Sequence, residues 1–374
     1  MSLPLDGKTV LWLSEFNKYI VTETPFDKII ELIYTGKNQE QILEYCIGKL
    51  NFSPDNANQI IKKIKLNLEE IQSNVNMLHN EIPSTAIPPA TFNCKRYYQI
   101  NGIIFIIEYE TDKIEFLIHP KFAHLEIPAT LDFINHFQVF KAESEIILVV
   151  DGKTIGNWPK EMEHFMTGKV SMEILQKIYG NEENDWMAVF HASAITNGKE
   201  SIMFLGDSGN GKSTIAAILM ASGLHLLADD FVPVDAKSGK VYNFPAALSV
   251  KKKALDLLIP LYPQLALAKE FYYKGLDKTV RYLPALPFPE NNSFYYPCRA
   301  LIFVKFKKDS GFKLKRIPKD EAFKQLIPDS WISPLPENAL FFLNWFIKLP
   351  CYQITYSDNV KMVNTIKNLF QDDL

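Results

Sequence analysis

The chain has 374 residues, of which 47% are hydrophobic and 22% charged, and its formal net charge is −3. This length and composition are typical of a globular protein with two or three domains and a sizeable apolar core. The weak net charge gives no electrostatic reason for binding nucleic acid or an anionic membrane, so we expect neither as a partner.

Targeting and membrane signals are missing from the sequence pattern. No apolar run reaches the roughly 18 residues of a membrane-spanning helix, and residues 1–16 lack the basic and apolar segments of a signal peptide. The four cysteines are scattered and have no metal-ligand spacing. We therefore expect a soluble, cytoplasmic protein with reduced thiols.

The N-terminal pattern predicts a small α+β module. Residues 8–22 indicate two short strands around a polar turn, and three helical patterns follow within residues 24–75. A strand pair followed by three helices is a winged-helix-like arrangement, which we place at residues 1–79. The proline-rich segment 80–91 is the best linker in the chain.

The next segment, residues 92–157, is expected to be rich in largely antiparallel strands. Strand-like stretches occur at residues 97–110, 113–119, 136–141 and 145–150. Residues 158–187 are then expected to be helical. Beyond residue 240, strands are expected at 300–306, 313–317 and 351–356, and helices at 320–327, 337–349 and 359–370.

A phosphate-binding loop is the clearest motif. The pattern G-x-x-x-x-G-K-S/T is matched without exception by Gly206, Asp207, Ser208, Gly209, Asn210, Gly211, Lys212 and Ser213, with Thr214 next. The glycines let backbone N–H groups face phosphate oxygens, Lys212 neutralises the β- and γ-phosphates, and the Ser213 hydroxyl can bind Mg²⁺. A buried strand (201–205) precedes the loop and a helix (213–222) follows it, so phosphate would lie at a helix N-terminus.

Two adjacent carboxylates follow the next strand, 224–228. Asp229 and Asp230 are expected at its carboxyl end, where an α/β sheet places its ligand chemistry. One carboxylate could hold the metal while the other faces an acceptor hydroxyl; alternatively, one of them only caps a turn. His191 precedes the loop strand and could lie beside the phosphates, or could be a structural histidine.

These residues together, FHASAI and then GKESIMFLGDSGNGKSTIAAILMASGLHLLADDFVPV, resemble the HPr kinase/phosphorylase family and its relatives. The resemblance spans about 40 residues. It implies an HPr-kinase-like domain at 92–374, with its P-loop core at 186–374. It also implies that Lys212 and Ser213 bind phosphate and Mg²⁺, with ATP as donor, and that one aspartate is the general base. We take Asp229 as base, Asp230 as metal ligand, and His191 as the residue that orients or tunes the base.

The resemblance is incomplete downstream. The E-x-R-G-x-G signature of bacterial HPr kinases is absent from residues 241–258, so HPr itself and phosphorolysis are not implied. The chain is more similar to HPr-kinase-related enzymes of peptide-modifying gene clusters, including lasso-peptide pathways. In LDKTVRYLP, Lys278 and Arg281 are candidates to neutralise transferred phosphate, with solvent-exposed charge as the alternative.

Residues 12–71 resemble a PqqD-like domain, the peptide-recognition element of ribosomal peptide pathways. Such a domain binds a leader peptide by adding it as a strand to its sheet, here near residues 16–22. The resemblances together predict a Mg²⁺–ATP-dependent kinase that phosphorylates a serine or threonine of a ribosomal precursor peptide held by residues 1–79. The alternatives are a small-molecule kinase, for instance of free serine, and a non-catalytic nucleotide-binding adaptor. The HPr-kinase relatives are often hexameric, so a homo-oligomer is compatible with the resemblance.

Overall fold

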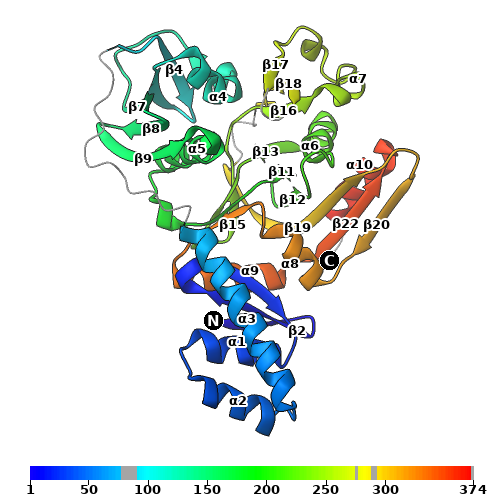
Figure 1. The fold of residues 1–374 in the computed structure, drawn as a ribbon. Coiled ribbons are helices and arrows are strands. Elements are labelled where there is room, and N and C mark those ends of the chain that lie inside the picture. The colour runs from blue at the N-terminus through cyan, green and yellow to red at the C-terminus, as the bar shows by residue number, and fades with distance from the viewer. Residues whose placement is uncertain (77–90, 274–276, 288–292, 372–374) are drawn as a thin grey trace.

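The computed structural model describes residues 1–76, 91–273, 277–287 and 293–371, and these residues form a mixed α/β protein with four sheets (Figure 1). The α/β class expected from the sequence is confirmed in this general form. The N-terminal module lies at one end of the molecule, and a ten-stranded sheet lies between it and a six-stranded sheet (Figure 1). None of the described helices has the length and apolarity that a membrane crossing requires.

The N-terminal module is a three-stranded antiparallel sheet followed by three helices. Its strands and helices are β1 (Ser2–Leu5), β2 (Lys8–Leu13), β3 (Lys18–Thr22), α1 (Phe26–Tyr34), α2 (Gln39–Gly48) and α3 (Pro54–Asn76). The strand pair and three helices expected here are present, and β1 is an additional edge strand. Asn38 begins α2 with a reciprocal capping box to Gln41. The helices share a small apolar cluster that includes Ile29 and Ile61.

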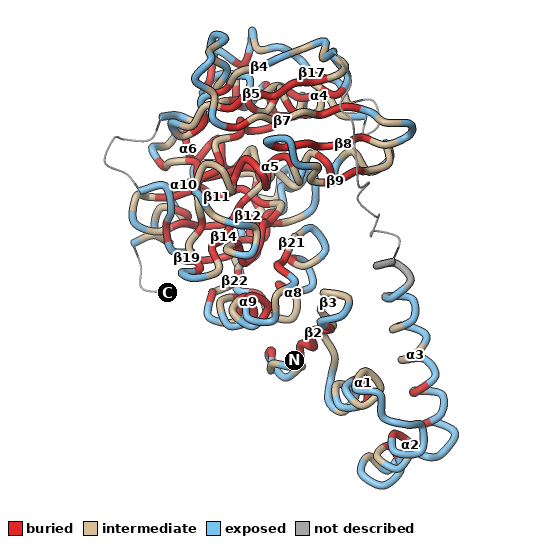
Figure 2. Tube along the Cα trace, turned by 90° about the vertical axis from the view of Figure 1, so that its left-hand side faces the viewer, coloured by how far each residue is buried: buried red, intermediate tan, exposed pale blue. Residues whose placement is uncertain are grey.

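This module contacts the rest of the chain through its sheet. Tyr19 of β3 packs edge-on against Phe323 of α8 (Lys319–Leu326) and Phe342 of α9 (Pro336–Lys348), at centroid distances of 5.8 and 5.6 Å. The Lys8 ammonium lies 2.7 Å from an Asp320 carboxylate oxygen. Helices α1–α3 extend away from the core, and much of their surface is exposed (Figure 2). The expected linker, 80–91, falls almost entirely outside the described residues.

The six-stranded sheet has the order β6-β4-β5-β7-β8-β9, with only β5 and β7 parallel. Its strands are β4 (Cys94–Ile100), β5 (Ile103–Tyr109), β6 (Glu126–Ile127), β7 (Asn135–Ala142), β8 (Glu145–Val150) and β9 (Lys153–Pro159). Helix α4 (Asp112–Phe122) connects the two parallel strands, and α5 (Glu163–Tyr179) contacts β8 and β9. The segment is therefore rich in mainly antiparallel strands, as expected.

Two sequence expectations in this region are wrong. Residues 113–119 were expected as a strand but lie in α4, where Ile114, Ile118 and Phe122 are buried at a spacing of four residues. Thr111 caps this helix by accepting a hydrogen bond from the Ile114 N–H. The helix expected over 158–187 is shorter, because β9 continues to Pro159 and Gly180 ends α5 in a left-handed conformation.

The ten-stranded sheet carries the phosphate-loop motif. Its strands are β10 (Trp186–Phe190), β11 (Ser193–Thr196), β12 (Ser201–Leu205), β13 (His225–Asp229), β14 (Val232–Asp235), β15 (Lys240–Tyr242), β19 (Tyr295–Phe306), β20 (Phe312–Arg316), β21 (Ser330–Ile332) and β22 (Cys351–Tyr356). The main path is β13-β11-β12-β19-β15-β14-β10-β21, and β22 joins β20 to β19. Helices α6 (Lys212–Ala221) and α10 (Asn359–Leu369) share an apolar cluster with β12 and β19.

A small sheet stands beside the ten-stranded one. Its strands are β16 (Leu248–Lys251), β17 (Phe271–Tyr273) and β18 (Lys278–Leu283), in the order β16-β18-β17, and the short helix α7 (Leu255–Leu258) follows β16. Phe116 of α4 packs against Phe271 and Tyr273 of β17, with centroids 5.9 and 4.8 Å apart. The six-stranded unit therefore contacts the small sheet directly.

Candidate functional site

The site begins where β12 and β13 end. Strand β11 lies between them and pairs antiparallel with both, so β12 and β13 run in the same direction. Their carboxyl ends, Leu205 and Asp229, therefore meet at one edge of the sheet. Ser193, the first residue of β11, pairs with Phe204 on one side and Asp229 on the other.

The loop after β12 has the backbone that a phosphate cradle needs. Gly206 has φ +123°, and a Cβ at this position would lie 2.9 Å from the Val304 carbonyl oxygen, so only glycine fits. The Lys212 ammonium is 2.5 Å from the Gly206 carbonyl oxygen, and the Lys212 residue is only 5% exposed. Burial lowers the pKa of Lys212, while Asp230 and Asp229 oppose that effect.

The expected loop residues divide into two groups. Those that line a cavity of about 220 Å³ over the loop are Ser208, Gly209, Gly211, Lys212, Ser213 and Thr214. The other three, Gly206, Asp207 and Asn210, stabilise the loop: the Asn210 N–H donates to the Asp207 carbonyl, and the Asn210 carbonyl accepts from the Phe306 N–H. The first turn of α6 thus opens into the cavity, as an anion site at a helix N-terminus requires.

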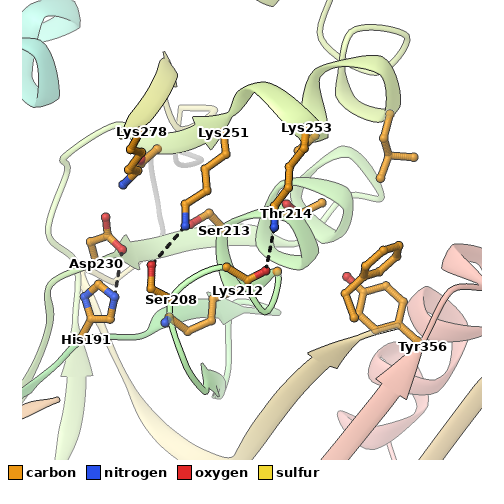
Figure 3. Close-up of a pocket in the computed structure, with 16 residues that line it drawn as sticks. His191, Ser208, Lys212, Ser213, Thr214, Asp230, Lys251, Lys253, Lys278 and Tyr356 are labelled. Carbon is orange, nitrogen blue, oxygen red and sulfur yellow. Dashed lines mark hydrogen bonds and ion pairs between the residues drawn. The ribbon is translucent and has the colours of Figure 1, made fainter. Parts of the chain in front are cut away.

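Two lysines at this cavity were not predicted from the sequence. Lys251 at the end of β16 donates to the Ser208 hydroxyl at 3.1 Å, and Lys253 donates to the Gly209 carbonyl at 3.3 Å (Figure 3). Burial and the neighbouring charges of Lys278 and Lys253 lower the pKa of Lys251. The run of three consecutive lysines, 251–253, was the available signal. Lys252 between them is exposed and does not line the cavity.

Asp229 points into the protein beneath the loop. It is 2% exposed, accepts a 2.5 Å hydrogen bond from the Ser193 hydroxyl, and accepts a longer one from the Ser249 N–H. Burial and repulsion by Asp230 raise the pKa of Asp229 to about 7, although hydrogen bonds from Ser193, Ser213 and Ser249 oppose the shift. Asp229 is therefore hydrogen-bonded to the loop serine that was predicted to hold Mg²⁺.

Asp230 points the other way, into open space at the cavity. Its backbone is left-handed, with φ +62°, a conformation that aspartate adopts more readily than most residues. This turn separates the two successive carboxylates, so that Asp230 lines the cavity while Asp229 does not. Burial acts against its ionisation, but the charges of Lys121, Lys278 and Lys212, and of His191 when it is protonated, lower the pKa of Asp230.

His191 lies beside Asp230 in the bend between β10 and β11, whereas the family resemblance assigned it to the base, taken as Asp229. Its Nε2 is 3.7 Å from an Asp230 carboxylate oxygen (Figure 3), and its backbone N–H donates to the Asp329 carbonyl. Burial lowers the pKa of His191, and Asp230 partly offsets this. The ring is therefore mainly neutral at neutral pH, and it borders the carboxylate without a direct hydrogen bond.

Of the two downstream cations, the structure brings only Lys278 to the site. Lys278 begins β18 and lines the cavity near Asp230 (Figure 3). Arg281 is three residues further along the same strand, so its side chain leaves the opposite face. It donates to the carbonyls of Leu265 and Ala266 and pairs with Glu270 at 3.1 Å. Arg281 therefore stabilises a loop instead of lining the cavity.

A second cavity, of about 360 Å³, adjoins the first. The residues that line both are His191, Asp230, Ser249 and Lys278. Asp229 also reaches the second cavity, whose other walls come from α4, α5, β17 and β18. Asp230 thus lies at the junction between the cavity over the glycine-rich loop and a separate chamber.

The end of the first cavity away from Asp230 is apolar and aromatic. Phe306 and Tyr356 stand edge to face there, with centroids 5.7 Å apart, and Ala254 and Leu257 line the same cavity. Figure 3 shows Tyr356 at the opposite end of the loop from His191 and Asp230. This arrangement suits a planar, stacking group such as a nucleobase.

The oxygen donors at the loop suit Mg²⁺ better than a transition metal. Among the residues that the structure describes, no cluster of three or more His, Cys, Asp or Glu side chains is placed to hold a metal ion. Nucleotide-bound Mg²⁺ takes only one or two protein ligands, with water and phosphate oxygens completing its shell. The hydroxyl of Ser213 and the carboxylate of Asp229, which hydrogen-bond to each other, fit that requirement.

Comparison with known proteins adds little to this geometry. No protein-family model matches the chain, and no curated protein matches it. The solved structure of the Hpr(Ser) kinase/phosphatase from Coxiella burnetii is similar over 49% of this chain and 93% of that chain, with 12% sequence identity and a TM-score of 0.21. A likeness of that size supports no conclusion about activity or substrate, which must come from the site itself.

Proposed function

We propose that this protein is a Mg²⁺-dependent phosphotransferase that moves the γ-phosphate of a nucleoside triphosphate onto a hydroxyl group. The observation that supports this most directly is the junction of the two cavities at Asp230. One cavity has the loop, the lysines and the helix N-terminus that bind phosphates, and the other has room for an acceptor. A switch or motor protein would not need a second chamber that shares a carboxylate with the phosphate site.

The geometry favours the opposite order of the aspartate pair from the one taken from the family resemblance. Asp229 is buried and hydrogen-bonded to Ser213, so it is placed to hold Mg²⁺; Asp230 faces both cavities, so it is placed to accept a proton. The acceptor oxygen forms a bond to the γ-phosphorus, the bond to the β-phosphate oxygen breaks, and the hydroxyl proton passes to the Asp230 carboxylate. When bound, Mg²⁺ supplies charge neutralisation of the phosphates.

Other residues around the junction neutralise charge or orient the base. Lys212 and Lys278 line the cavity from different elements (Figure 3), and we assign both to neutralise the charge of the transferred phosphoryl group. His191, neutral beside Asp230, limits the directions in which that carboxylate can turn. The apolar end at Phe306 accepts a purine by stacking, in keeping with ATP as the donor expected from the sequence.

We further propose that the N-terminal module delivers the acceptor as a peptide. Strand β3 is a terminal strand of its sheet, which suits strand addition by an extended peptide. Free serine as acceptor and a purely nucleotide-binding adaptor are the competing functions. Phosphate transfer from labelled ATP to serine-containing peptides, to free L-serine, or to neither distinguishes the three.

The test of the site compares two matched variants of the full chain. Asp230→Asn is expected to lower phosphate transfer by at least about 100-fold, the scale of a general base, with little effect on binding of a fluorescent ATP analogue in Mg²⁺. Asp229→Asn is expected to weaken that Mg²⁺-dependent binding itself. Lys252→Met, an exposed change between two cavity lysines, is the control and should be silent. Normal Mg²⁺-dependent binding in Asp229→Asn, together with lost transfer, would refute the order proposed here.

A further inference from the structure

The second cavity is built by two parts of the chain that meet at the site. One wall is made by α4 and α5, which pack on the six-stranded sheet; the opposite wall is made by the ends of β13 and β16 and by β18. Its volume of about 360 Å³ is at the lower limit for ligand sites, which suits one amino-acid-sized group. The helices that pack on the six-stranded sheet therefore line this cavity directly.

Lys121 is the distinctive charge in this cavity. Besides Tyr273 and Tyr282, the titratable groups that line it are Lys121, Lys278, His164, His191, Glu163, Asp229 and Asp230. Of the two lysines, Lys278 also lines the phosphate cavity, whereas Lys121 lines only the second one. Lys121 comes from the last turn of α4, on the wall that faces Asp230.

The ammonium of Lys121 is close to the aspartate pair but not in contact with it. Burial lowers the pKa of Lys121, and the charges of Asp230 and Asp229 raise it. Yet within the described part of the chain, neither carboxylate lies within 4.0 Å of this ammonium, and no hydrogen bond to it is formed. A half-buried cation without a direct partner leaves room between itself and Asp230.

Most of the remaining lining residues are apolar or aromatic, and Thr167, Ser171 and Ser249 are the aliphatic hydroxyl residues among them. Phe231, Phe244 and Tyr282 supply aromatic surface. Ser249 lines both cavities, and its hydroxyl is buried without a hydrogen-bond partner among the described residues. A buried hydroxyl of this kind is expected to bind a polar group of a ligand.

We propose that Lys121 binds a carboxylate of the acceptor, so that the acceptor is a hydroxy acid whose hydroxyl reaches Asp230 and Ser249. This inference rests on the proposed phosphotransfer and adds the acceptor's chemistry to it. The apolar walls strengthen the attraction between Lys121 and a carboxylate, because they exclude water. The carboxylate can belong to a free hydroxy amino acid or to an acidic residue next to the hydroxyl residue in a peptide.

The experiment measures phosphate transfer from labelled ATP to two matched pairs of probes, using the full chain. One pair is L-serine and L-serinamide; the other is acetyl-Gly-Ser-Asp-Gly-amide and acetyl-Gly-Ser-Asn-Gly-amide. The acidic member of at least one pair is expected to exceed its neutral partner in kcat/KM by about 10- to 100-fold, the scale of a charge-assisted hydrogen bond. The pair that shows the preference identifies the source of the carboxylate.

Three variants separate a binding role from a structural one. Lys121→Met is expected to raise the acceptor KM by about 10- to 100-fold and to remove the preference for the acid, with kcat and the KM for ATP little changed. Lys121→Arg should restore part of the preference. Lys113→Met, an exposed change on the same helix outside the cavity, should behave as the unmodified protein.

The outcomes distinguish this inference from the proposed function. Equal use of acid and amide, or an unchanged preference in Lys121→Met, overturns the role of Lys121 while phosphotransfer stands. ADP formation that depends on Asp230, without labelling of any of the four probes, also overturns it. If ADP formation does not depend on Asp230 and no probe is labelled, the proposed phosphotransfer fails as well.

Discussion

Replacing Asp229 by asparagine tests, independently of catalysis, whether ionisation of this buried carboxylate destabilises the folded protein. The pKa of Asp229 rises from 3.8 to about 7, mainly through burial and repulsion by Asp230. At about 1.4 kcal/mol for each tenfold change in proton affinity, this rise in pKa corresponds to roughly 4 kcal/mol in the free energy of unfolding. Because the pKa is higher in the folded chain, this stabilisation is present below about pH 4 and is lost as the pH rises to about 7.

An uncharged residue at this position cannot ionise, so the loss of stability that accompanies ionisation of Asp229, called the electrostatic penalty below, does not occur in Asp229→Asn. About half of the penalty, roughly 2 kcal/mol, develops between about pH 5.5 and pH 7. The asparagine side chain can still accept a hydrogen bond from the Ser193 hydroxyl, but its amide group lacks the second acceptor oxygen, which offsets the gain by about 1 kcal/mol at every pH. Asp229→Asn is therefore expected to gain about 2 kcal/mol relative to the unmodified chain when the pH is raised from about 5.5 to 8.5.

The assay is urea unfolding of the nucleotide-free protein in a chelator at the two pH values. Asp185→Asn is the control of opposite sign, because a hydrogen bond from Lys237 is the first cause that lowers the pKa of Asp185. That carboxylate stabilises the fold above its unfolded pKa, so its removal should destabilise the chain at both pH values. A difference between Asp229→Asn and the unmodified protein that does not change with pH would refute the reasoning.

Three further predictions concern the site. Below about pH 7 the Mg²⁺-dependent affinity for an ATP analogue should fall by up to about tenfold per pH unit, because the metal needs ionised Asp229; titrations at several pH values check this, and Asp229→Asn should flatten the dependence. Phe306→Ala should raise the KM for ATP by up to about tenfold through lost stacking. An unchanged KM would mean that the adenine ring of ATP binds elsewhere. Arg281→Met should lower the Tm and leave transfer kinetics unchanged, since Arg281 only braces the loop at Leu265 and Ala266; a loss of kcat would contradict that role.

The local part of the site was predictable because it is nearly continuous in sequence. A fully buried strand, a glycine-rich loop, a helix and a second strand ending in Asp229 follow one another within 29 residues, from Ser201 to Asp229. Burial runs and glycine spacing determine each of these elements without help from distant residues. The exchange of roles that we propose within the aspartate pair was not predictable, because it depends on the left-handed turn at Asp230.

The remote part of the site depends on contacts that the sequence does not display. Lys121 reaches the cavity only because Phe116 packs α4 against β17, and this stretch of isoleucines and a phenylalanine looked like a strand. Periodicity could have corrected that assignment, since the buried residues of α4 recur every four positions. Periodicity also explains why Lys278 lines the cavity and Arg281 does not, since residues three apart on a strand face opposite sides.

The N-terminal module, proposed to bind the peptide, contacts strands that lead to the proposed catalytic residues. The Asn17 side chain donates to the Ile332 carbonyl at 2.7 Å, and Ile332 lies on β21, which pairs with β10. His191 directly follows β10, and its N–H donates to the Asp329 carbonyl just before β21. The contacts that connect the N-terminal module to the His191–Asp230 pair therefore pass through β21 and β10. If the N-terminal module binds the acceptor peptide as proposed, tethering raises the local acceptor concentration to about the millimolar scale, and Lys121 then needs to supply selectivity more than affinity.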